Sequence, residues 1–200
     1  ALPMTLAGKD IAGQGRTGTG KTATFLITAL KKLIETPGKE NRKNNQPRVF
    51  IIAPTRELVI QIASDATNLT KYTNLNVHAV FGGVDYEKQQ KAFETGVDIL
   101  VGTPGRLIDF HKKNCYNLHA VDVMVLDEAD RMFDLGFIKD LRFLLNRLPK
   151  YDQRQSLMFS ATLSHRVMEL AYDHMNNPEK IRAEEGDLTA ASIVESMYHT

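Results

Sequence analysis

Short apolar runs alternate with longer amphipathic segments along almost the whole chain. The apolar runs predict strands near residues 11–14, 48–53, 76–80, 98–101, 122–126 and 156–159. The intervening segments have the length and apolar spacing of helices, at 21–35, 56–71, 86–93, 105–112, 138–147 and 165–176. Two runs, VFII (49–52) and VMVL (123–126), are apolar at every position, which is typical of parallel strands covered on both faces. The alternation predicts one doubly wound α/β domain with a mostly parallel sheet.

The composition is that of an ordinary globular protein and excludes several classes of function. Apolar residues make up 42% and charged residues 24% of the 200 residues, which suits one domain with a substantial core. The formal net charge of +1 gives no overall basic field, so any nucleic-acid site must be local. No apolar run approaches the ~18 residues of a membrane span, so no membrane contact is expected. The lone Cys115 excludes a disulfide framework within the chain and predicts a reducing, cytoplasmic location.

Two polar segments stand outside this alternation. Residues 36–47 (TPGKENRKNNQP) are expected to form a flexible surface loop, whose charge suits solvation, with RNA contact as the alternative. Residues 184–200 change to a mixed polar composition and are expected to be a linker or tail, which leaves 1–183 as the folded domain. The chain starts without methionine, so we expect it to begin inside a longer protein.

Residues 15–22 (GRTGTGKT) fit the phosphate-binding pattern GxxxxGK(S/T) at every fixed position. The glycines let the backbone curl and direct successive N–H groups at one anion, and the helix predicted next has its N-terminus at the phosphates. Lys21 adds a positive charge for the β- and γ-phosphates, and Thr22 offers a hydroxyl to Mg²⁺. A glycine-rich turn with a chance lysine is the alternative. The predicted nucleotide-binding residues are Gly15, Arg16, Thr17, Gly18, Thr19, Gly20, Lys21 and Thr22.

Residues 127–130 (DEAD) directly follow an apolar strand. A carboxylate in this place holds magnesium in phosphate-loop enzymes, which makes Asp127 and Thr22 the predicted metal-binding residues. Glu128 is predicted to orient or deprotonate an attacking water, so Lys21, Asp127 and Glu128 form the predicted catalytic set. The alternative is an acidic strand-to-helix turn with Asp130 as a helix cap.

Six short motifs in order carry a family resemblance: GRTGTGKT (15–22), APTREL (53–58), GG (82–83), TPGR (103–106), DEAD (127–130) and SAT (160–162). Together they resemble the first RecA-like domain of a DEAD-box ATP-dependent RNA helicase. Within that family, DEADRMFDLGF (127–137), NQPR (45–48) and FSATLS (159–164) are most similar to the bacterial RhlB type. The resemblance implies a RecA-like sheet with helices on both faces, ATP and Mg²⁺ as cofactors, RNA as partner, and a second RecA-like domain. The RhlB likeness implies association with a bacterial RNA-decay assembly.

The resemblance also implies an RNA site at three turns, each of which follows a predicted strand and opens onto a helix. Such turns present N–H groups to phosphate, and arginines add charge-assisted contacts, so backbone rather than bases would be read. The alternative is ordinary turn chemistry, with Arg56 paired to Glu57 or Asp130. The predicted RNA-binding residues are Pro54, Thr55, Arg56, Gly82, Gly83, Thr103, Pro104, Gly105 and Arg106.

The SAT motif is implied to couple the nucleotide site to RNA by hydrogen-bonding the DEAD residues. The predicted coupling residues are Asp130, Ser160 and Thr162, and helix capping by Thr162 or Ser164 is a compatible alternative. Phe81 and Tyr86 are interpreted as structural.

The chain departs from the family pattern in three ways. Gly15 stands where alanine is usual. The upstream aromatic and glutamine that recognise adenine are missing, as is the second RecA-like domain with its arginine fingers. We therefore expect this chain alone to bind nucleotide weakly and to hydrolyse it slowly, if at all. A different phosphate-loop motor, such as a DNA helicase or translocase, and a non-enzymatic RNA clamp switched by nucleotide are the competing interpretations.

Overall fold

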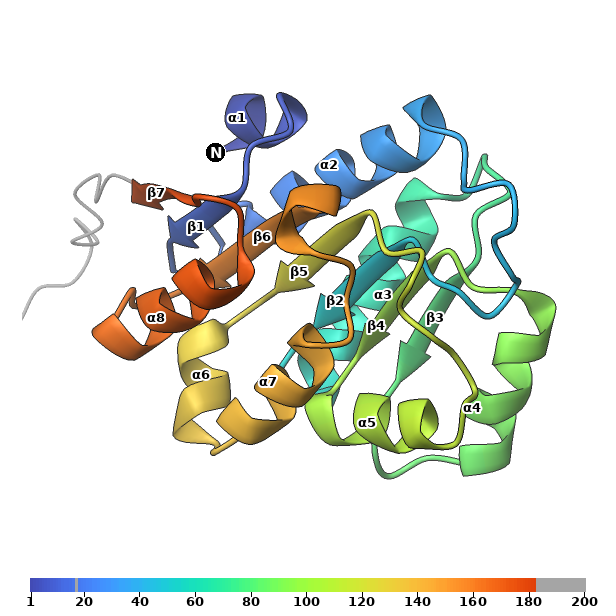
Figure 1. Ribbon diagram of the computed structural model, residues 1–200. Coiled ribbons are helices and arrows are strands. Elements are labelled where there is room, and N and C mark those ends of the chain that lie inside the picture. Colours follow the sequence, from blue (N-terminus) through green and yellow to red (C-terminus); the bar gives the residue numbers. More distant parts are fainter. Residues whose placement is uncertain (17, 183–200) are drawn as a thin grey trace, which may run out of the picture.

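Seven strands form the centre of the molecule, in the order β3-β4-β2-β5-β6-β1-β7 (Figure 1). The computed structural model describes residues 1–16 and 18–182. Every strand pairing is parallel. The strands are β1 (Ile11–Gln14), β2 (Val49–Ile52), β3 (Val77–Val80), β4 (Ile99–Gly102), β5 (Val123–Leu126), β6 (Gln155–Ser160) and β7 (Glu179–Arg182).

Helices cover both faces of this sheet (Figure 1). They are α1 (Leu2–Leu6), α2 (Lys21–Glu35), α3 (Arg56–Leu69), α4 (Tyr86–Ala92), α5 (Pro104–Lys112), α6 (Ala129–Asp134), α7 (Ile138–Leu145) and α8 (His165–His174), with the 3-10 turns η1 (Phe93–Thr95) and η2 (Tyr151–Gln153). Helices α1 to α3 pack on one face and α4 to α8 on the other.

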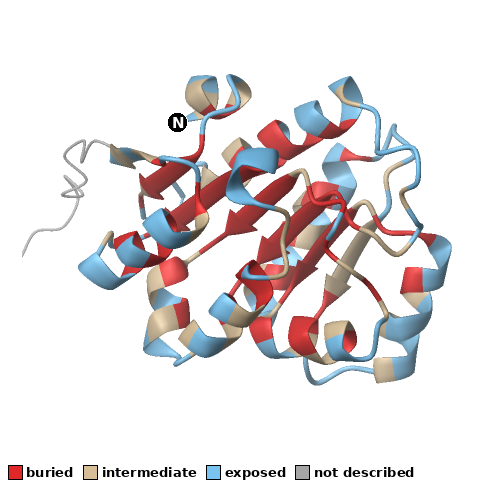
Figure 2. Cartoon of the chain, viewed as in Figure 1, coloured by how far each residue is buried: buried red, intermediate tan, exposed pale blue. Residues whose placement is uncertain are grey.

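The strands are buried on both faces, as Figure 2 shows for the centre of the sheet. Successive side chains of a strand point to opposite faces. In β2, Val49 and Ile51 join the core under α2 and α3, whereas Phe50 and Ile52 join the core under α5 to α8. This double burial explains why β2 and β5 are apolar at every position.

The predicted α/β architecture is confirmed, with each predicted strand and helix present to within a few residues. The sheet is parallel throughout rather than mostly parallel. Three elements were not predicted: α1, α6 and β7. The two helices have only five and six residues, too few for a clear apolar period, and β7 is a half-exposed edge strand with the sequence EKIR.

Side chains of the polar loop at 36–47 anchor it by hydrogen bonds to residues next to the sheet. Neither interpretation of this loop, as a solvated surface loop or as an RNA contact, predicted this anchoring role. Arg42 Nη2 donates to Asp98 Oδ1 at 2.7 Å and to the Val97 carbonyl at 2.6 Å. Lys39 Nζ donates to the His119 carbonyl at 3.0 Å. These partners precede β4 and β5, so the loop lies at the amino edge of the sheet, opposite the predicted functional motifs.

The carboxyl edge of the sheet collects the predicted functional loops, because parallel strands end on the same side. The loops that follow β1, β2, β3, β4, β5 and β6 carry the six motifs. Thr17 and the predicted tail at 184–200 lie outside the described residues. Within the described part of the chain, no helix is long and apolar enough to cross a membrane.

Candidate nucleotide and RNA site

The phosphate loop connects β1 to the N-terminus of α2. Gly18 and Gly20 have φ angles of 86° and 78°, a left-handed conformation that L side chains rarely adopt. Gly20 is the N-cap of α2, so the free N–H groups of the first helical turn lie directly after the loop. At both positions, therefore, the backbone of the predicted anion site adopts a conformation that favours glycine.

The loop is closed by hydrogen bonds of its own. Lys21 Nζ donates to the Gly15 carbonyl at 2.7 Å, and Thr19 Oγ1 donates to the Arg16 carbonyl at 2.8 Å. The Gly15 N–H donates to the Ser160 carbonyl at 3.0 Å and ties the loop to β6. To contact a bound phosphate, Lys21 Nζ would have to give up its hydrogen bond to the Gly15 carbonyl.

Asp127 lies at the end of β5, only 2% exposed, with its N–H bonded to the Ile52 carbonyl at 3.0 Å. Burial raises the pKa of Asp127 from 3.8 to about 6, the positive charge of Lys21 opposes this, and the negative charge of Glu128 adds to it. Lys21 and Asp127, 106 positions apart in the numbering, are thus brought within electrostatic reach of each other.

Glu128 has a left-handed backbone, with φ and ψ both 52°. This conformation is uncommon for a residue with a side chain, and such outliers concentrate at functional sites. Its Oε2 lies 3.4 Å from Arg131 Nη1, one turn further along α6. The backbone therefore turns sharply between the buried Asp127 and the helix.

Asp130 connects α6 to the SAT motif. Its N–H donates to Ser160 Oγ at 3.1 Å, and its Oδ2 accepts the Thr162 N–H at 2.9 Å and the Thr162 hydroxyl at 3.2 Å. Burial on its own would raise the pKa of Asp130, but hydrogen bonds from Ser160, Thr162 and Arg131 outweigh it and lower that pKa.

The capping alternatives at these two turns are now decided. Ser164 caps α8 by accepting the Val167 N–H at 3.4 Å, whereas Thr162 bonds to Asp130. The interpretation of Asp130 as a helix cap is wrong, because α6 begins at Ala129 with Glu128 at its N-cap.

The turns predicted to bind RNA open two helices. Thr55 caps α3, its Oγ1 accepting the Leu58 N–H at 3.3 Å, so ordinary turn chemistry is present there. Thr103 is the N-cap of α5 without a side-chain capping bond, and Pro104 fills the first helical position.

Arg56 links the first turn to the glycine pair. Its Nη1 donates to the Gly83 carbonyl at 3.4 Å, and its Cζ lies 5.2 Å from the centroid of the Phe81 ring. Among the described residues it forms no ion pair with Glu57 or Asp130. The alternative pairing is therefore not observed, and Phe81 supports the arginine.

Arg106 is oriented by aromatic rings. Its Cζ lies 5.1 Å from the Tyr86 centroid and 5.6 Å from the Phe110 centroid. Its Nη1 is buried without a hydrogen-bond partner in the part of the chain described. Sequence reasoning treated Tyr86 as structural, and no motif spacing indicated that it would position this arginine.

Gln89 is a second residue that sequence reasoning missed. Its Oε1 accepts the Phe81 N–H at 2.9 Å, and its Nε2 donates to the carbonyls of Phe81 at 3.2 Å and Asp85 at 3.3 Å. The amide fixes the path of the chain through Gly82 and Gly83, which is a third motif turn at the same edge.

The predicted magnesium ligands are compatible with that ion. Thr22 and Asp127 offer a hydroxyl and a carboxylate, the oxygen donors that Mg²⁺ prefers, and few protein ligands are needed because the ion keeps several waters. Burial is the main cause of the raised pKa of Asp127, and a divalent cation beside this carboxyl would favour its ionised form.

The parallel sheet and the loop at 15–22 define a phosphate-loop nucleotide-binding domain of the α/β class. Residues 1–170 match the DEAD/DEAH box helicase family. The chain belongs to this family, and its fold is RecA-like.

Curated relatives and a solved structure are similar along nearly the whole chain. The ATP-dependent RNA helicase RhlB of Shewanella sp. (strain MR-4) is 54% identical over 199 residues, covering 100% of this chain and 45% of that protein. RhlB of Yersinia pestis (strain Pestoides F) is 53% identical, covering 100% and 46%. A crystal structure of a hypothetical ATP-dependent RNA helicase from Sulfolobus tokodaii superposes with a TM-score of 0.78 at 32% identity, covering 91% of this chain and 50% of that one. The chain spans less than half the length of these curated relatives.

Proposed function

We propose that this domain binds ATP and RNA along the carboxyl edge of its sheet and forms the first RecA-like half of an ATP-dependent RNA helicase. The observation that carries the proposal is the meeting of Lys21, Asp127 and Glu128 at one edge, beside three turns that open toward the same side. The names of the relatives support ATP as the nucleotide and RNA as the polymer.

Each nucleotide-site residue has a separate task in this proposal. Lys21 leaves the Gly15 carbonyl to hold the β- and γ-phosphates, while the loop and the first turn of α2 donate N–H groups. Thr22 and Asp127 would hold Mg²⁺, which neutralises charge on the phosphates when bound. Glu128 orients the attacking water and accepts its proton.

The RNA contacts in this proposal are made to backbone. N–H groups of the turns at 54–56, 82–83 and 103–106 bind phosphate, and Arg56 and Arg106 add charge-assisted bonds. Recognition is therefore independent of base sequence. The bonds between Asp130, Ser160 and Thr162 would transmit nucleotide state from the DEAD segment to β6.

The proposal extends to the wider context of the domain. Residues 1–183 would act with a second RecA-like domain that supplies arginine fingers, which are worth about 10³–10⁵ in rate. The likeness to RhlB supports association with a bacterial RNA-decay assembly, and the single thiol, Cys115, suits a cytoplasmic location.

ATP turnover by this chain tests the proposal, measured with and without single-stranded RNA and with a second RecA-like domain added. We expect slow turnover by the chain alone, and RNA-stimulated turnover with the second domain. Lys21→Ala should abolish ATP binding, and Glu128→Gln should bind ATP without turning it over. Lys31→Ala is the matched control, because this exposed lysine of α2 pairs with Glu35 outside the loop. Turnover that survives Lys21→Ala would refute the proposal, and RNA binding with no turnover under any condition would favour the nucleotide-switched clamp.

A further inference from the structure

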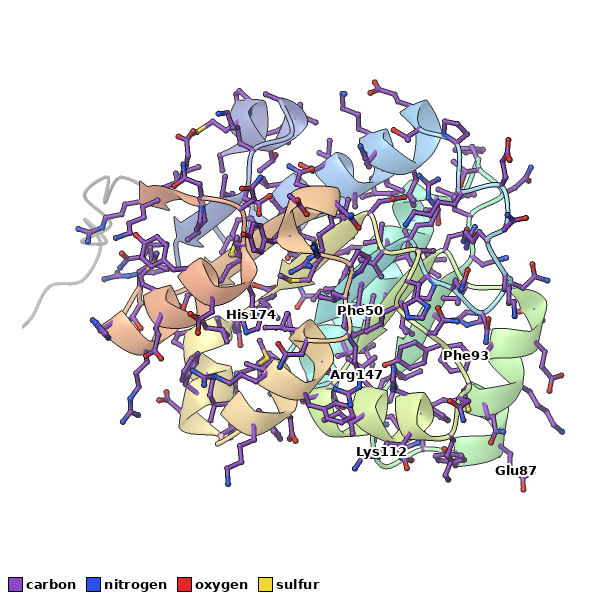
Figure 3. The ribbon with its side chains drawn as sticks, in the orientation of Figure 1. Phe50, Glu87, Phe93, Lys112, Arg147 and His174 are labelled. Atoms are coloured by element: carbon purple, nitrogen blue, oxygen red, sulfur yellow. The ribbon has the colours of Figure 1, made fainter. Side chains whose placement is uncertain are left out.

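Four basic side chains lie along α5 and at the end of α7: one of them belongs to the residues predicted to bind RNA, and the other three lie beyond those residues. We call Arg106, Lys112, Lys113 and Arg147 the basic rim. Arg106 lies in the first turn of α5, Lys112 and Lys113 lie at its end, and Arg147 follows the end of α7, which packs beside α5. Figure 3 shows Lys112 and Arg147 close to these neighbouring helix ends.

Tyr86 joins the rim to the TPGR turn. Its ring centroid lies 5.1 Å from Arg106 Cζ and 4.0 Å from Lys113 Nζ. Positions 106 and 113 are seven apart, two turns along one face of the helix. Tyr86 therefore links a cation at the proposed RNA turn to a cation at the end of α5, with the acidic Asp109 between them in the helix.

Phe143 organises the other side of the rim. Arg147 Cζ lies 3.3 Å and Lys112 Nζ 5.6 Å from its ring centroid. Arg147 is also fixed by a bond from its Nη1 to the Phe143 carbonyl at 2.6 Å. A guanidinium held in this way has already lost side-chain freedom, so binding a phosphate costs it less entropy.

A purely structural explanation covers part of this arrangement. Cations at helix C-termini offset the helix dipole, and α5 and α7 both end here. That effect does not account for four cations around three aromatic rings. Within the described residues, Lys112 and Lys113 form no ion pair, although the Tyr86 hydroxyl and the Asp109 carboxylate both act on the charge of Lys113. The rim therefore retains charge that is available to an anionic partner.

We infer that the basic rim carries single-stranded RNA as it leaves the TPGR turn, through its phosphates. This inference rests on the proposed function, because the strand must first bind the turns at the carboxyl edge. The rim is continuous with that site through Tyr86, and its charge is complementary to a phosphate backbone. It adds affinity without base preference, and only for strands long enough to pass the TPGR turn.

The test compares two oligouridines, one that fills only the turns and one several nucleotides longer, in fluorescence anisotropy titrations at several salt concentrations. The protein is this chain joined to a second RecA-like domain, with a non-hydrolysable ATP analogue. The variant is Lys112→Ala/Lys113→Ala, with Arg147→Ala as a second variant. The matched control is Lys31→Ala/Lys32→Ala, also two adjacent exposed lysines toward the end of a helix, but on the opposite face of the sheet.

We expect the rim variants to bind the short strand normally and the long strand several-fold more weakly. The slope of log affinity against log salt for the long strand should become shallower by about 1.4 in the double variant, at about 0.7 for each lost phosphate contact. Unchanged binding of the long strand, or an equal loss in the control, would overturn the inference and leave the proposed function standing. Equal competition by polyglutamate would also overturn it, by showing a general polyanion surface. Failure of the unmodified protein to bind either strand would overturn both proposals.

Discussion

The buried carboxyl of Asp127 should make stability depend on pH in an unusual direction. Its pKa is raised from 3.8 to about 6 in the folded protein, so between these values the folded state holds a proton that the unfolded chain has released. The contribution of Asp127 to the free energy of unfolding therefore falls as pH rises through this window. Asp127→Asn removes the dependence. We expect its stability relative to the unmodified chain to improve by roughly 3 kcal/mol between acid and neutral pH, in urea titrations without nucleotide.

Asp130→Asn is the matched control for that prediction. The hydrogen bonds of Asp130 lower its pKa, so its ionised form contributes stability at neutral pH that is lost as pH falls. The free energy of unfolding of Asp130→Asn should therefore decrease, relative to that of the unmodified chain, as pH rises. The same sign for both variants would contradict the electrostatic account of the DEAD segment.

Gly102, at the end of β4, is a position where a single methyl group should disturb the site. A Cβ there would lie 2.6 Å from Val80 Cγ2 and 2.7 Å from the Leu107 side chain, both in the core. Gly102→Ala should cost about 1–3 kcal/mol, because overpacking moves β3 or the start of α5. Gly105→Ala is the control, since a Cβ at Gly105 meets nothing within 4 Å and alanine favours the helix. The midpoints of thermal unfolding distinguish the two variants. Equal midpoints would show that β3 and α5 can move to accommodate the added methyl group without loss of stability.

At the scale of elements, α6 and β6 are joined by the proposed coupling bonds. Ser160→Ala leaves the Asp130 N–H without its partner, at a cost of about 1–2 kcal/mol. We expect this variant, joined to a second RecA-like domain, to bind ATP normally and to lose stimulation of turnover by RNA. Ser164→Ala removes the cap of α8 at a similar cost of about 1 kcal/mol, and should keep RNA stimulation. Equal loss in both variants would mean that stability, and not coupling, sets the rate.

The elements that the sequence predicts well are those whose signal is local. β2 and β5 are apolar throughout because both their faces are buried, and α2 and α3 have enough turns to show a helical period. β7 could not be found in this way, since EKIR acquires strand geometry only by pairing with β1. The anchoring role of the loop at 36–47 likewise depends on partners such as Asp98, which are distant in the sequence.

The candidate site shows the same division. Gly18 and Gly20 were predictable because their left-handed backbone geometry strongly favours glycine, and Asp127 because it follows a buried strand. The aromatic supports of the arginines were not predictable. Phe81 and Tyr86 contact Arg56 and Arg106 through tertiary packing, which no spacing within the chain encodes.

In the whole molecule, the residues proposed to act on nucleotide and RNA lie at one edge of the sheet, and the buried polar residues that anchor the fold lie at the other. The carboxyl edge of the sheet carries the phosphate loop and the charged turns, whereas the amino edge carries buried polar anchors. Asp10, 6% exposed just before β1, accepts the Ser156 N–H at 2.9 Å and the Asn176 N–H at 2.8 Å. It thereby joins the starts of β1 and β6 to the segment after α8, one strand length of about 13 Å from the phosphate loop.

This separation predicts that two variants have opposite effects on stability and on ATP affinity. Asp10→Ala leaves two N–H groups without partners and should cost about 2–5 kcal/mol in unfolding free energy, while the chain that remains folded binds ATP with unchanged affinity. Lys21→Ala should do the reverse, because Lys21 contributes one partly buried hydrogen bond to the fold and the central charge to phosphate binding. Asp152→Ala, which removes an exposed carboxylate from η2 at the same edge as Asp10, should change neither quantity. Calorimetric ATP titrations at low temperature, beside urea unfolding, measure both. If Asp10→Ala weakened ATP binding in the folded chain, strain would be passing along β1, and the two edges would act as one unit.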